Sequence, residues 1–493
     1  MTSCTDKNHK HTVSIDILPD NVLLEIFSFC IDSRYTDRQW QRLVHVCQRW
    51  RGLIFASPRR LDLHLKCSFG TPVRKNLIFW PVTLPLVVNF YRFRDPISPE
   101  DEDNVVAALE HPSRVRHITI VATAPLIKKL VTILWKPFPA LTWLHLECKD
   151  STFPVISRRF LGGSRFPRLG FLYLKHISFP RLPLHFSSAR NLATLDIGEM
   201  PANGYILPDA MVRTLAVLPR LDYLSISFCQ KMSLSDLSRS QPHPQMRTIH
   251  PALTCINYRG RSEYLEDFLA RIDTPEIDAV IIEYSNHQIE ISQLLQFIER
   301  TENLKIDQFA RARVQFTNNK YSFALGRSQE AWCECNVHLQ IEGEASIEAQ
   351  VEDMAHLIGR FSSTFSKVDD LFAHGDNPVQ TGGTDITKWL PLFRLFPAVE
   401  TLRLSGRLAV YVTSALEDAT EEMVTDVFPA LSLIRIAESE AGPGPPWDKA
   451  EDADDWMEQV GSMKRFLSLR QLSGCSIRVI NPEDELAEVE DWW

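Results

Sequence analysis

The sequence predicts an α/β protein in which an N-terminal helical unit precedes a solenoid of repeats, with parallel strands on its concave face and helices outside. Three observations predict this. Residues 15–57 carry two apolar runs with helical spacing, the phrase Leu-x-x-Leu-x-Leu recurs after residue 58, and helix-like runs separate its copies. The 493 residues are 44% hydrophobic and 23% charged, which is typical of a folded, soluble chain.

Two amphipathic helices are predicted near the N-terminus, and Asp20 can cap the first of them. The first helix has i, i+3, i+4 apolar spacing at Val22, Leu23, Ile26 and Phe27. The second has the same spacing at Leu43, Val46, Cys47 and Trp50. Because a unit of about 40 residues rarely supplies a sufficient core, the surplus apolar surface suggests a docking site for another protein. The alternative is an ordinary helical hairpin with these residues packed inside.

The order of these residues resembles an F-box. The shared pattern is Leu-Pro, then Ile-Phe seven residues after the proline, then Val-Cys-x-x-Trp-Arg. Members of that family bind a Skp-type adaptor and so join a cullin–RING ubiquitin ligase. The resemblance covers residues 15–57 and implies that seven residues line the adaptor contact or the small core beneath it: Leu18, Pro19, Ile26, Phe27, Val46, Cys47 and Trp50. The link from Ile31 to Trp40 is longer than is usual in the family.

A leucine-rich phrase recurs through residues 58–437. Its clear copies are 23 to 32 residues apart and begin at residues 141, 169, 192, 221, 253 and 277. This is the period of leucine-rich repeats. The Leu-x-Leu alternation puts two side chains on one face of a short strand, and stacked repeats bury what a single repeat leaves exposed. We therefore expect one buried column on neighbouring strands, formed by Leu144, Leu172, Leu195 and Leu224.

Helix-like runs between the copies predict an outer layer of the solenoid. They are Glu102–Glu110, Pro208–Leu218, Tyr264–Ile272, Ile289–Arg300, Ser346–Phe361 and Ala415–Val427. The window from 304 to 372 is the least regular, although Val337-x-Leu339-x-Ile341 restores the rhythm there. A conventional α/β domain whose strands happen to read Leu-x-Leu is the alternative. An F-box followed by leucine-rich repeats resembles a known class of substrate receptors.

The two ends of the chain differ in composition from the rest. Residues 1–14 are polar and are expected to form a disordered tail without the apolar core of a signal peptide. Residues 438–493 contain 14 acidic and 5 basic residues, so their net charge of −9 accounts for that of the whole chain. This acidic C-terminal segment includes a possible capping strand within 465–480.

Charge and cysteine usage limit the partners and the compartment. A net charge of −9 argues against a nucleic-acid or anionic-membrane partner. The ten cysteines are scattered, mostly within apolar runs, as expected for free thiols in a reducing compartment. The longest apolar stretch, Leu77–Val88, contains two prolines and is too short to span a bilayer. We therefore expect a cytoplasmic or nuclear protein without a membrane partner.

No catalytic motif is found in the sequence. It has no P-loop, no dinucleotide-binding glycine motif after a strand and no nucleophile elbow. Cys333-Glu334-Cys335 near His338 lacks the ligand number and the Cys-x-x-Cys spacing of a zinc site. The prediction is therefore a non-enzymatic chain without cofactor, metal or catalytic residues. An enzyme whose active site carries none of these motifs is the alternative.

Large side chains are predicted on the concave face, at the positions that flank the second leucine of each phrase. Such a cluster of aromatic residues has the composition of a binding hot spot. Arg403 and Arg435 occupy late positions of the same type and could bind a phosphate. The predicted substrate contacts are Trp143, His145, Phe171, Tyr173 and Tyr223.

These features together predict the substrate-recognition subunit of a Skp–cullin–F-box ubiquitin ligase. The F-box would dock the Skp-type adaptor, and the repeats would hold a protein substrate close to the conjugating enzyme. The alternative is a non-catalytic F-box and leucine-rich-repeat scaffold that acts outside ubiquitination. The sequence leaves open which substrate is bound and whether binding needs its phosphorylation.

Overall fold

The structure, a computed structural model, is a mixed α/β chain whose strands are mostly parallel. It describes residues 15–30, 39–58, 60–91, 98–156, 160, 166–178, 186, 189–229, 247–285, 289–327, 335–343, 346–362, 364–375, 386–406, 408–417, 426–437 and 463–480. The predicted tail 1–14 and most of the acidic segment 438–493 lie outside these residues. The chain divides into two compact units, Met1–Leu172 and Tyr173–Trp493, and the division falls inside the predicted repeat region.

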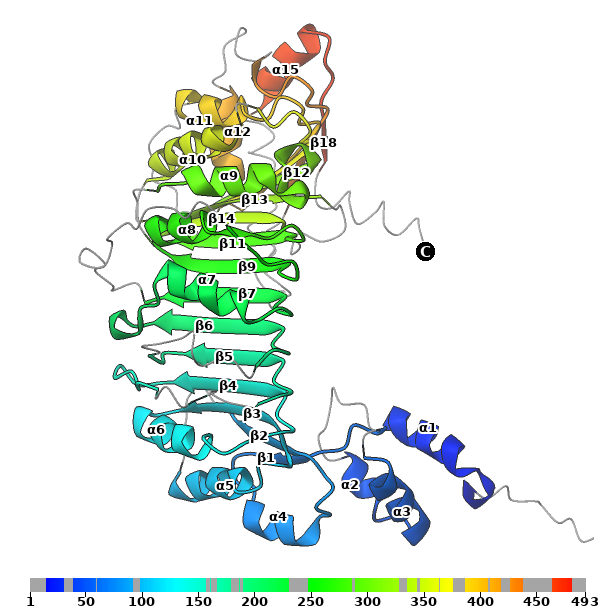
Figure 1. Cartoon of the computed structure of the whole chain (residues 1–493). Helices are drawn as coiled ribbons and strands as arrows, with labels where there is room; N and C mark the ends of the chain where they lie inside the picture. The colour runs from blue at the N-terminus through cyan, green and yellow to red at the C-terminus, as the bar shows by residue number, and fades with distance from the viewer. Residues whose placement is uncertain are drawn as a thin grey trace, which may run out of the picture. The chain divides into compact units, whose positions relative to one another are not determined.

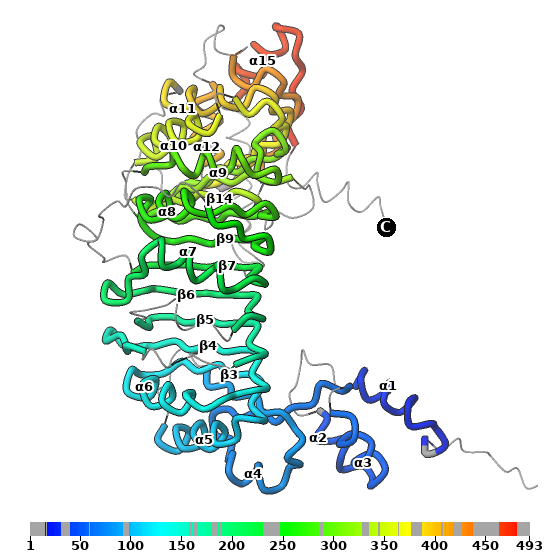
Figure 2. Tube along the Cα trace, in the orientation of Figure 1, coloured from blue at the N-terminus to red at the C-terminus, as the bar shows by residue number. Residues whose placement is uncertain are grey.

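The first unit begins with three helices that share one core. They are α1 (Asp20–Cys30), α2 (Gln39–Leu43) and α3 (Gln48–Ala56), preceded by the short 3₁₀ helix η1 (Ile15–Ile17). Their buried side chains pack with residues from the chain that follows them, namely Leu61, Leu63 and Leu84. The helices therefore complete their core on the start of the sheet region, which lies next along the Cα trace in Figure 2.

The remainder of the first unit is a run of parallel strands with helices between them. The strands are β1 (Leu65–Cys67), β2 (Leu86–Phe90), β3 (Val115–Ala122), β4 (Trp143–Cys148) and the start of β5 (Phe171–Lys175). The helices are α4 (Val73–Phe79), α5 (Pro99–Leu109) and α6 (Ala124–Ile133). Val88, Ile118 and Leu144 are opposite one another in the strand register and are fully buried, so they form one column of the core.

Local sequence explains why these elements start where they do. Ser98 caps α5, because its hydroxyl accepts a hydrogen bond from Asp101 N at 3.1 Å, and Pro99 occupies the first helical turn. The Phe-Pro turns before β4 and β5 place Phe138 and Phe166 in the core, where their rings stack 6.0 Å apart. Each turn therefore contributes one buried ring beneath the strand that it introduces.

The second unit continues with strands and helices in alternation. Its strands are β6 (Thr194–Met200), β7 (Tyr223–Phe228), β8 (Thr248–Ile249), β9 (Cys255–Gly260), β10 (Ile272–Asp273), β11 (Ala279–Tyr284), β12 (Arg311–Phe316), β13 (Lys320–Gly326), β14 (Val337–Glu342), β15 (Asp370–Gly375), β16 (Thr401–Gly406), β17 (Leu433–Ala437) and β18 (Arg478–Ile480). Its helices are α7 (Pro208–Ala216), α8 (Ser262–Leu269), α9 (Ser292–Arg300), α10 (Ile347–Phe361), α11 (Ile386–Phe393), α12 (Leu408–Glu417) and α15 (Lys464–Leu472), with short 3₁₀ helices at η3 (Ala202–Gly204), η4 (Glu302–Leu304) and η5 (Ile306–Gln308).

The strands of the second unit are joined by a repeated hydrogen bond at their entrances. Thr254 N donates to Asp222 O at 2.9 Å, and Asp278 N donates in turn to Thr254 O at 2.8 Å. Figure 1 shows α7, α8 and α9 on one side of β7, β9 and β11. The buried Glu266 of α8 accepts hydrogen bonds from Gln293 N and Leu294 N and so caps the first turn of α9.

The structure confirms the expected burial of the leucines that the repeated phrase places on the strands. Leu144, Leu172, Leu195 and Leu224 are all fully buried, and Leu195 and Leu224 are register partners on β6 and β7. Five of the six predicted helical runs coincide with α5, α7, α8, α9 and α10, within a few residues at each end. In the sixth, Ala415–Val427, residues 418–425 lie outside the described part, and α12 starts earlier, at Leu408.

The expectation of parallel strands throughout is wrong in the irregular window. The strand order there is β11-β14-β13-β12-β15, and β13 is antiparallel to both β12 and β14. The reversal follows from a tight hairpin in which Thr317 N donates to Lys320 O at 2.8 Å. Parallel pairing resumes between β12 and β15 and continues to β18, which pairs with β17 inside the predicted capping region.

Candidate binding surfaces

The seven residues predicted to serve adaptor binding lie at three depths. Phe27 is fully buried in the core of the helices, whereas Pro19 and Val46 are exposed. The other four are half-buried: Leu18, Ile26, Cys47 and Trp50. The Trp50 ring packs on Phe27 with 4.7 Å between centroids, and Cys47 Sγ accepts a hydrogen bond from Trp50 N at the start of α3. The packing between α1 and α3 is therefore formed by Phe27, Cys47 and Trp50. The residues that are at least partly accessible to a partner are Pro19, Ile26 and Val46.

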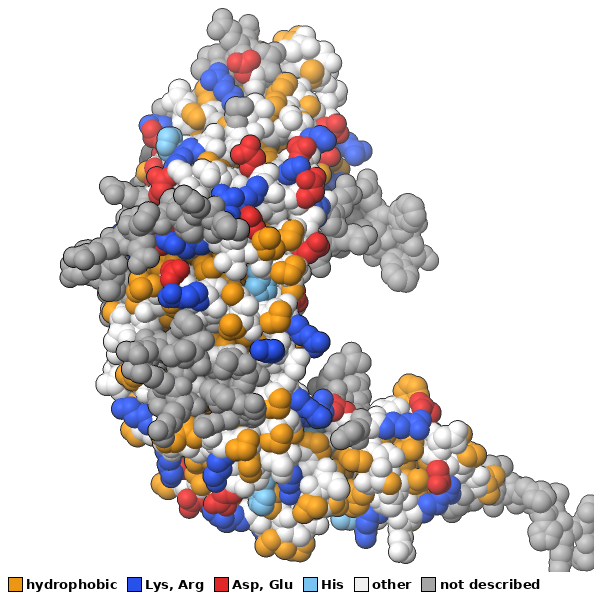
Figure 3. Space-filling model, viewed as in Figure 1, with side chains coloured by type: hydrophobic (Ala, Val, Ile, Leu, Met, Phe, Trp, Pro, Cys, Tyr) orange, Lys and Arg blue, Asp and Glu red, His pale blue; other side chains and the backbone are white. Residues whose placement is uncertain are grey.

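An apolar stripe runs along the outer side of α1. It consists of Val22, Ile26 and Phe29, which stand at i, i+4 and i+7 and therefore share one helical face; this set is called the α1 stripe below. Phe29 is 82% exposed, and Val22 is 37% exposed. Figure 3 shows hydrophobic side chains reaching the surface among charged ones over the helices of this segment. The three side chains form a partly exposed apolar strip on one helical face, and contiguous apolar patches often mark interaction sites.

Phe29 lies outside the residues that the F-box pattern predicts for adaptor binding. The F-box pattern ends its first apolar pair at Phe27, and the apolar spacing of the first helix places Val22 with Leu23, Ile26 and Phe27. The signal was nevertheless present, because Val22, Ile26 and Phe29 have heptad-like spacing that is offset from the buried pair Leu23 and Phe27.

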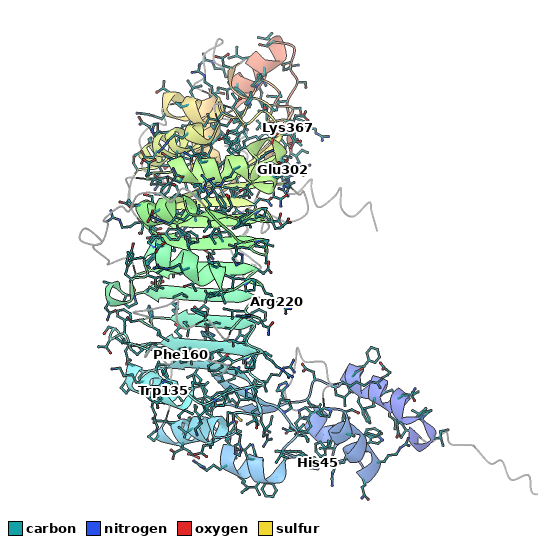
Figure 4. All side chains as sticks on the ribbon, in the orientation of Figure 1. His45, Trp135, Phe160, Arg220, Glu302 and Lys367 are labelled. Carbon is teal, nitrogen blue, oxygen red and sulfur yellow. The ribbon has the colours of Figure 1, made fainter. Side chains whose placement is uncertain are left out.

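Polar contacts fix the arrangement of α1 relative to α3. Arg49 Nη2 lies 2.6 Å from Asp20 Oδ1 and also donates to Leu18 O at 2.6 Å. His45, labelled in Figure 4, lies in the turn before α3 and packs its ring 6.4 Å from that of Trp80. The Arg49 contacts join the start of α3 to the start of α1 without using the side chains of the α1 stripe.

A second candidate surface is a row of aromatic rings across three strands of the first unit. His117 on β3 stacks on Trp143 of β4 with centroids 5.2 Å apart and planes within 7° of parallel. Trp143 stacks in turn on Phe171 of β5 at 4.8 Å. His117, Trp143 and Phe171 are called the aromatic row below. They alternate with buried isoleucine and leucine side chains of the same strands, so they face away from the core.

The aromatic row offers both apolar area and a polar group. Phe171 is 42% exposed, and Trp143 is half-buried. The indole N–H of Trp143 is buried and has no acceptor among the described residues. A bound peptide carbonyl would satisfy this donor, which costs free energy when it is left without a partner.

The other predicted substrate contacts lie on β4, β5 and β7. His145 lies on β4 two residues after Trp143, and its ring lies 6.0 Å from that of Tyr91. Tyr173 is half-buried on β5, two residues beyond Phe171. Tyr223 belongs to β7 in the second unit, where its hydroxyl accepts a hydrogen bond from Asn257 Nδ2 at 3.2 Å. The structure therefore brings Trp143 and Phe171 into direct contact.

Of the two late arginines, Arg403 has surroundings that differ from those expected for a phosphate site. Arg403 forms a two-point contact with Asp370, at 3.0 Å and 2.9 Å, so its guanidinium already holds a carboxylate. Arg435 is its register partner on β17. Cys333 of the dismissed Cys-x-Cys pair lies outside the described residues.

The environment of His117 predicts a pH-dependent stability. Burial of its ring, with added repulsion from His64, His145 and Arg116, lowers the pKa of His117 to about 4. The unfolded chain has the ordinary pKa of about 6.5. Between these values the unfolded state binds more protons, so the free energy of unfolding falls as the pH drops through this window. We expect a loss of about 1 to 2 kcal/mol from pH 7.5 to pH 4.5, allowing for partial solvent screening.

Urea unfolding of the wild type and of His117→Gln at both pH values measures this effect. The difference between the two proteins isolates His117 from all other titrating groups. The variant is expected to lose less stability on acidification. An identical loss in both proteins would assign the pH dependence to other residues.

No protein-family model matches the chain, and no curated protein gives a match. None of the helices in the described ranges is both long and apolar enough to cross a membrane. Any function of the α1 stripe and of the aromatic row is therefore argued from the residues of these two surfaces alone.

Proposed function

We propose that the chain is the substrate-recognition subunit of a Skp–cullin–F-box ubiquitin ligase. The helices of residues 15–57 dock a Skp-type adaptor, and through it a cullin–RING ligase. The sheet region holds a protein substrate, and catalysis belongs to the partner complex. The chain itself raises the local concentration of substrate lysines beside the conjugating enzyme, without a cofactor of its own. Such a chain would work in the cytoplasm or the nucleus.

The observation that carries the proposal is the α1 stripe. It places the half-buried Ile26, at a position of the F-box pattern, between the exposed side chains of Val22 and Phe29 on one helical face. Phe29 is exposed on a short helix, and the packing of Phe27 against Trp50 supports the other face of that helix. Such a helix can insert its exposed apolar side chains into an apolar groove of a partner. The Leu-Pro, Ile-Phe and Val-Cys-x-x-Trp-Arg pattern resembles an F-box, and this resemblance points to a Skp-type adaptor as the partner.

We also propose that residues 58–437 form a leucine-rich-repeat solenoid with its parallel strands on a concave face. Three features support this. The phrase recurs every 23 to 32 residues from 141 to 277, buried residues of neighbouring strands are register partners, and one entrance hydrogen bond is repeated from strand to strand. The hairpin of β12 and β13 is then an insertion within the repeats.

The aromatic row is the proposed centre of the substrate contact. Its rings are stacked, and aromatic residues are common in binding hot spots. The buried indole N–H of Trp143, which has no acceptor among the described residues, can donate a hydrogen bond to a bound substrate. His145, Tyr173 and Tyr223 remain proposed substrate contacts.

Trp143→Ala is expected to weaken substrate capture while leaving adaptor binding intact. Truncation of a central hot-spot ring costs about 2 kcal/mol, which is roughly a thirtyfold loss of affinity. Quantitative capture from cells with the proteasome inhibited measures the proteins that the wild type enriches over the variant. Phe79→Ala is the matched control, because it removes another exposed ring of the first unit, away from the row. If both variants retain the same set of proteins, the substrate binds elsewhere.

The proposal as a whole is tested by capture with the intact chain and with a chain that lacks residues 15–57. The intact chain is expected to bring down both adaptor and cullin, and the shortened chain neither. A non-catalytic scaffold, the alternative function, would bring down the adaptor without the cullin. Recovery of the adaptor by both chains would contradict the assignment of the dock.

A further inference from the structure

Three side chains of metal-ligand type come together in the second unit. His176 directly follows β5, Glu199 lies near the end of β6, and Cys229 directly follows β7. One donor atom from each, an imidazole nitrogen, a carboxylate oxygen and a thiol sulfur, lies within 4.8 Å of the other two. All three residues are half-buried. They are the only group of three or more such side chains with this proximity among the described residues.

The backbone at this cluster has an unusual conformation. His176 and Glu199 have φ values of 56° and 50°, in the left-handed region that residues other than glycine rarely adopt. The register between β6 and β7 is irregular between Ile197 and Met200, as in a β-bulge, which can re-aim a side chain. Strain of this kind concentrates at functional sites.

Hydrogen bonds hold this conformation in place. His176 N donates to Gly198 O at 3.1 Å, and Glu199 N donates to Ser227 Oγ at 2.7 Å. Cys229 N donates to Met200 O at 3.0 Å. The main chain thus fixes the three donor-bearing segments before any ligand arrives.

We propose that His176, Glu199 and Cys229 bind a divalent transition-metal ion, for which Zn²⁺ is the best match. Imidazole nitrogen, carboxylate oxygen and thiolate sulfur are the ligands that Zn²⁺ takes in proteins. On binding, the Cys229 thiol releases its proton to solvent and its sulfur becomes the ligand. The thiol then gives up its present hydrogen bond to Glu199 O, at 3.0 Å. Three protein ligands leave the fourth tetrahedral position for water or a partner group.

The charges around the cluster are compatible with a bound cation. The Glu199 carboxylate and the Cys229 thiolate together balance a charge of +2. Arg259 Nη1 lies 3.5 Å from Glu199 Oε1, but the same guanidinium also contacts Glu342 at 2.8 Å and Glu283 at 3.5 Å. Arg259 therefore keeps carboxylate partners when Glu199 turns to the metal. This site is independent of the proposed ligase function.

The test uses the full-length chain, stripped of metal and reduced. Titration with Zn²⁺ in competition with a chromophoric chelator is expected to show one tight equivalent. Co²⁺ in place of Zn²⁺ is expected to give a thiolate-to-metal charge-transfer band, which reports sulfur ligation directly. Cys229→Ser and Glu199→Gln should each weaken the tight equivalent at least about tenfold, and Cys229→Ser should abolish the band.

Two further variants serve as controls: one for the loss of any thiol, and one for the effect of the positive φ at His176 on the fold. Cys255→Ser removes another half-buried thiol of the second unit and should leave the tight equivalent and the band unchanged. His176→Asn removes the imidazole but keeps a residue that tolerates positive φ, so the fold is expected to persist in circular dichroism. Absence of a tight equivalent or of the charge-transfer band in the wild type overturns the proposal. Wild-type affinity in folded Cys229→Ser does so as well.

Discussion

Replacement of both Ile26 and Phe29 by aspartate is expected to abolish binding of the Skp-type adaptor. Both side chains belong to the α1 stripe, and Phe29 is 82% exposed in the isolated chain. A docked adaptor would bury both aspartates in an apolar interface without partners, which is strongly unfavourable. We expect the affinity to fall by about a hundredfold or more, since two hot-spot side chains are lost together. Isothermal titration of the purified chain with purified adaptor measures the change.

The matched control places two aspartates elsewhere on the same helix. Asn21 and Ser28 are exposed and lie off the α1 stripe. Asn21→Asp with Ser28→Asp adds the same charge to α1 and should bind the adaptor within a few-fold of the wild type. Equal losses in the two double variants would mean that helix stability or net charge, rather than the stripe, governs adaptor binding.

Leu224→Asp is expected to unfold the strands around β7. Leu224 is fully buried and is the register partner of Leu195 on β6 and of Ile256 on β9. The change removes apolar contacts and buries a carboxylate without a partner, at a cost of about 4 kcal/mol or more. That is a large share of the 5 to 15 kcal/mol that stabilises an ordinary domain. Urea unfolding followed by far-ultraviolet circular dichroism measures the loss.

Thr194→Asp is the control for this experiment. Thr194 is half-buried on β6 and alternates with Leu195, so the same charge then faces away from the core. We expect a cost below about 1 kcal/mol. If the two variants are equally unstable, the assignment of core and open positions along these strands is wrong.

The positions of the buried leucines could be predicted from sequence because strand alternation and burial leave a simple pattern. Leu144 and Leu224 occupy the same place in their phrases, and both are fully buried. The same logic predicted that Trp143 and Phe171 would be partly exposed, since they alternate with those leucines. The stacking of Trp143 on Phe171 could not be predicted from the sequence, because it depends on the register between neighbouring strands.

The reversal at β13 was missed for a physical reason. The leucine-rich phrase predicts one parallel strand per repeat, whereas Arg311–Phe316 and Lys320–Gly326 form an antiparallel hairpin around Thr317 and Asn319. Two adjacent asparagines between alternating runs are a turn signal that favours antiparallel pairing. This turn signal spans only a few residues, and the regular spacing of the leucine-rich phrase favours a parallel strand at the same place.

The cluster of His176, Glu199 and Cys229 could not be found by motif spacing. Its members are 23 and 30 residues apart, far beyond the short intervals of a metal motif. These intervals match the repeat period, so successive strand ends bring the side chains together. Alignment of the phrases by strand end, rather than by leucine, would have revealed them.

The most direct test of the central claim is co-elution of purified chain, Skp-type adaptor and cullin in size-exclusion chromatography. We predict one complex that contains all three proteins, and its loss when the chain carries Ile26→Asp and Phe29→Asp. Elution of the wild-type chain apart from both partners would contradict the proposal that this protein is a ubiquitin-ligase receptor.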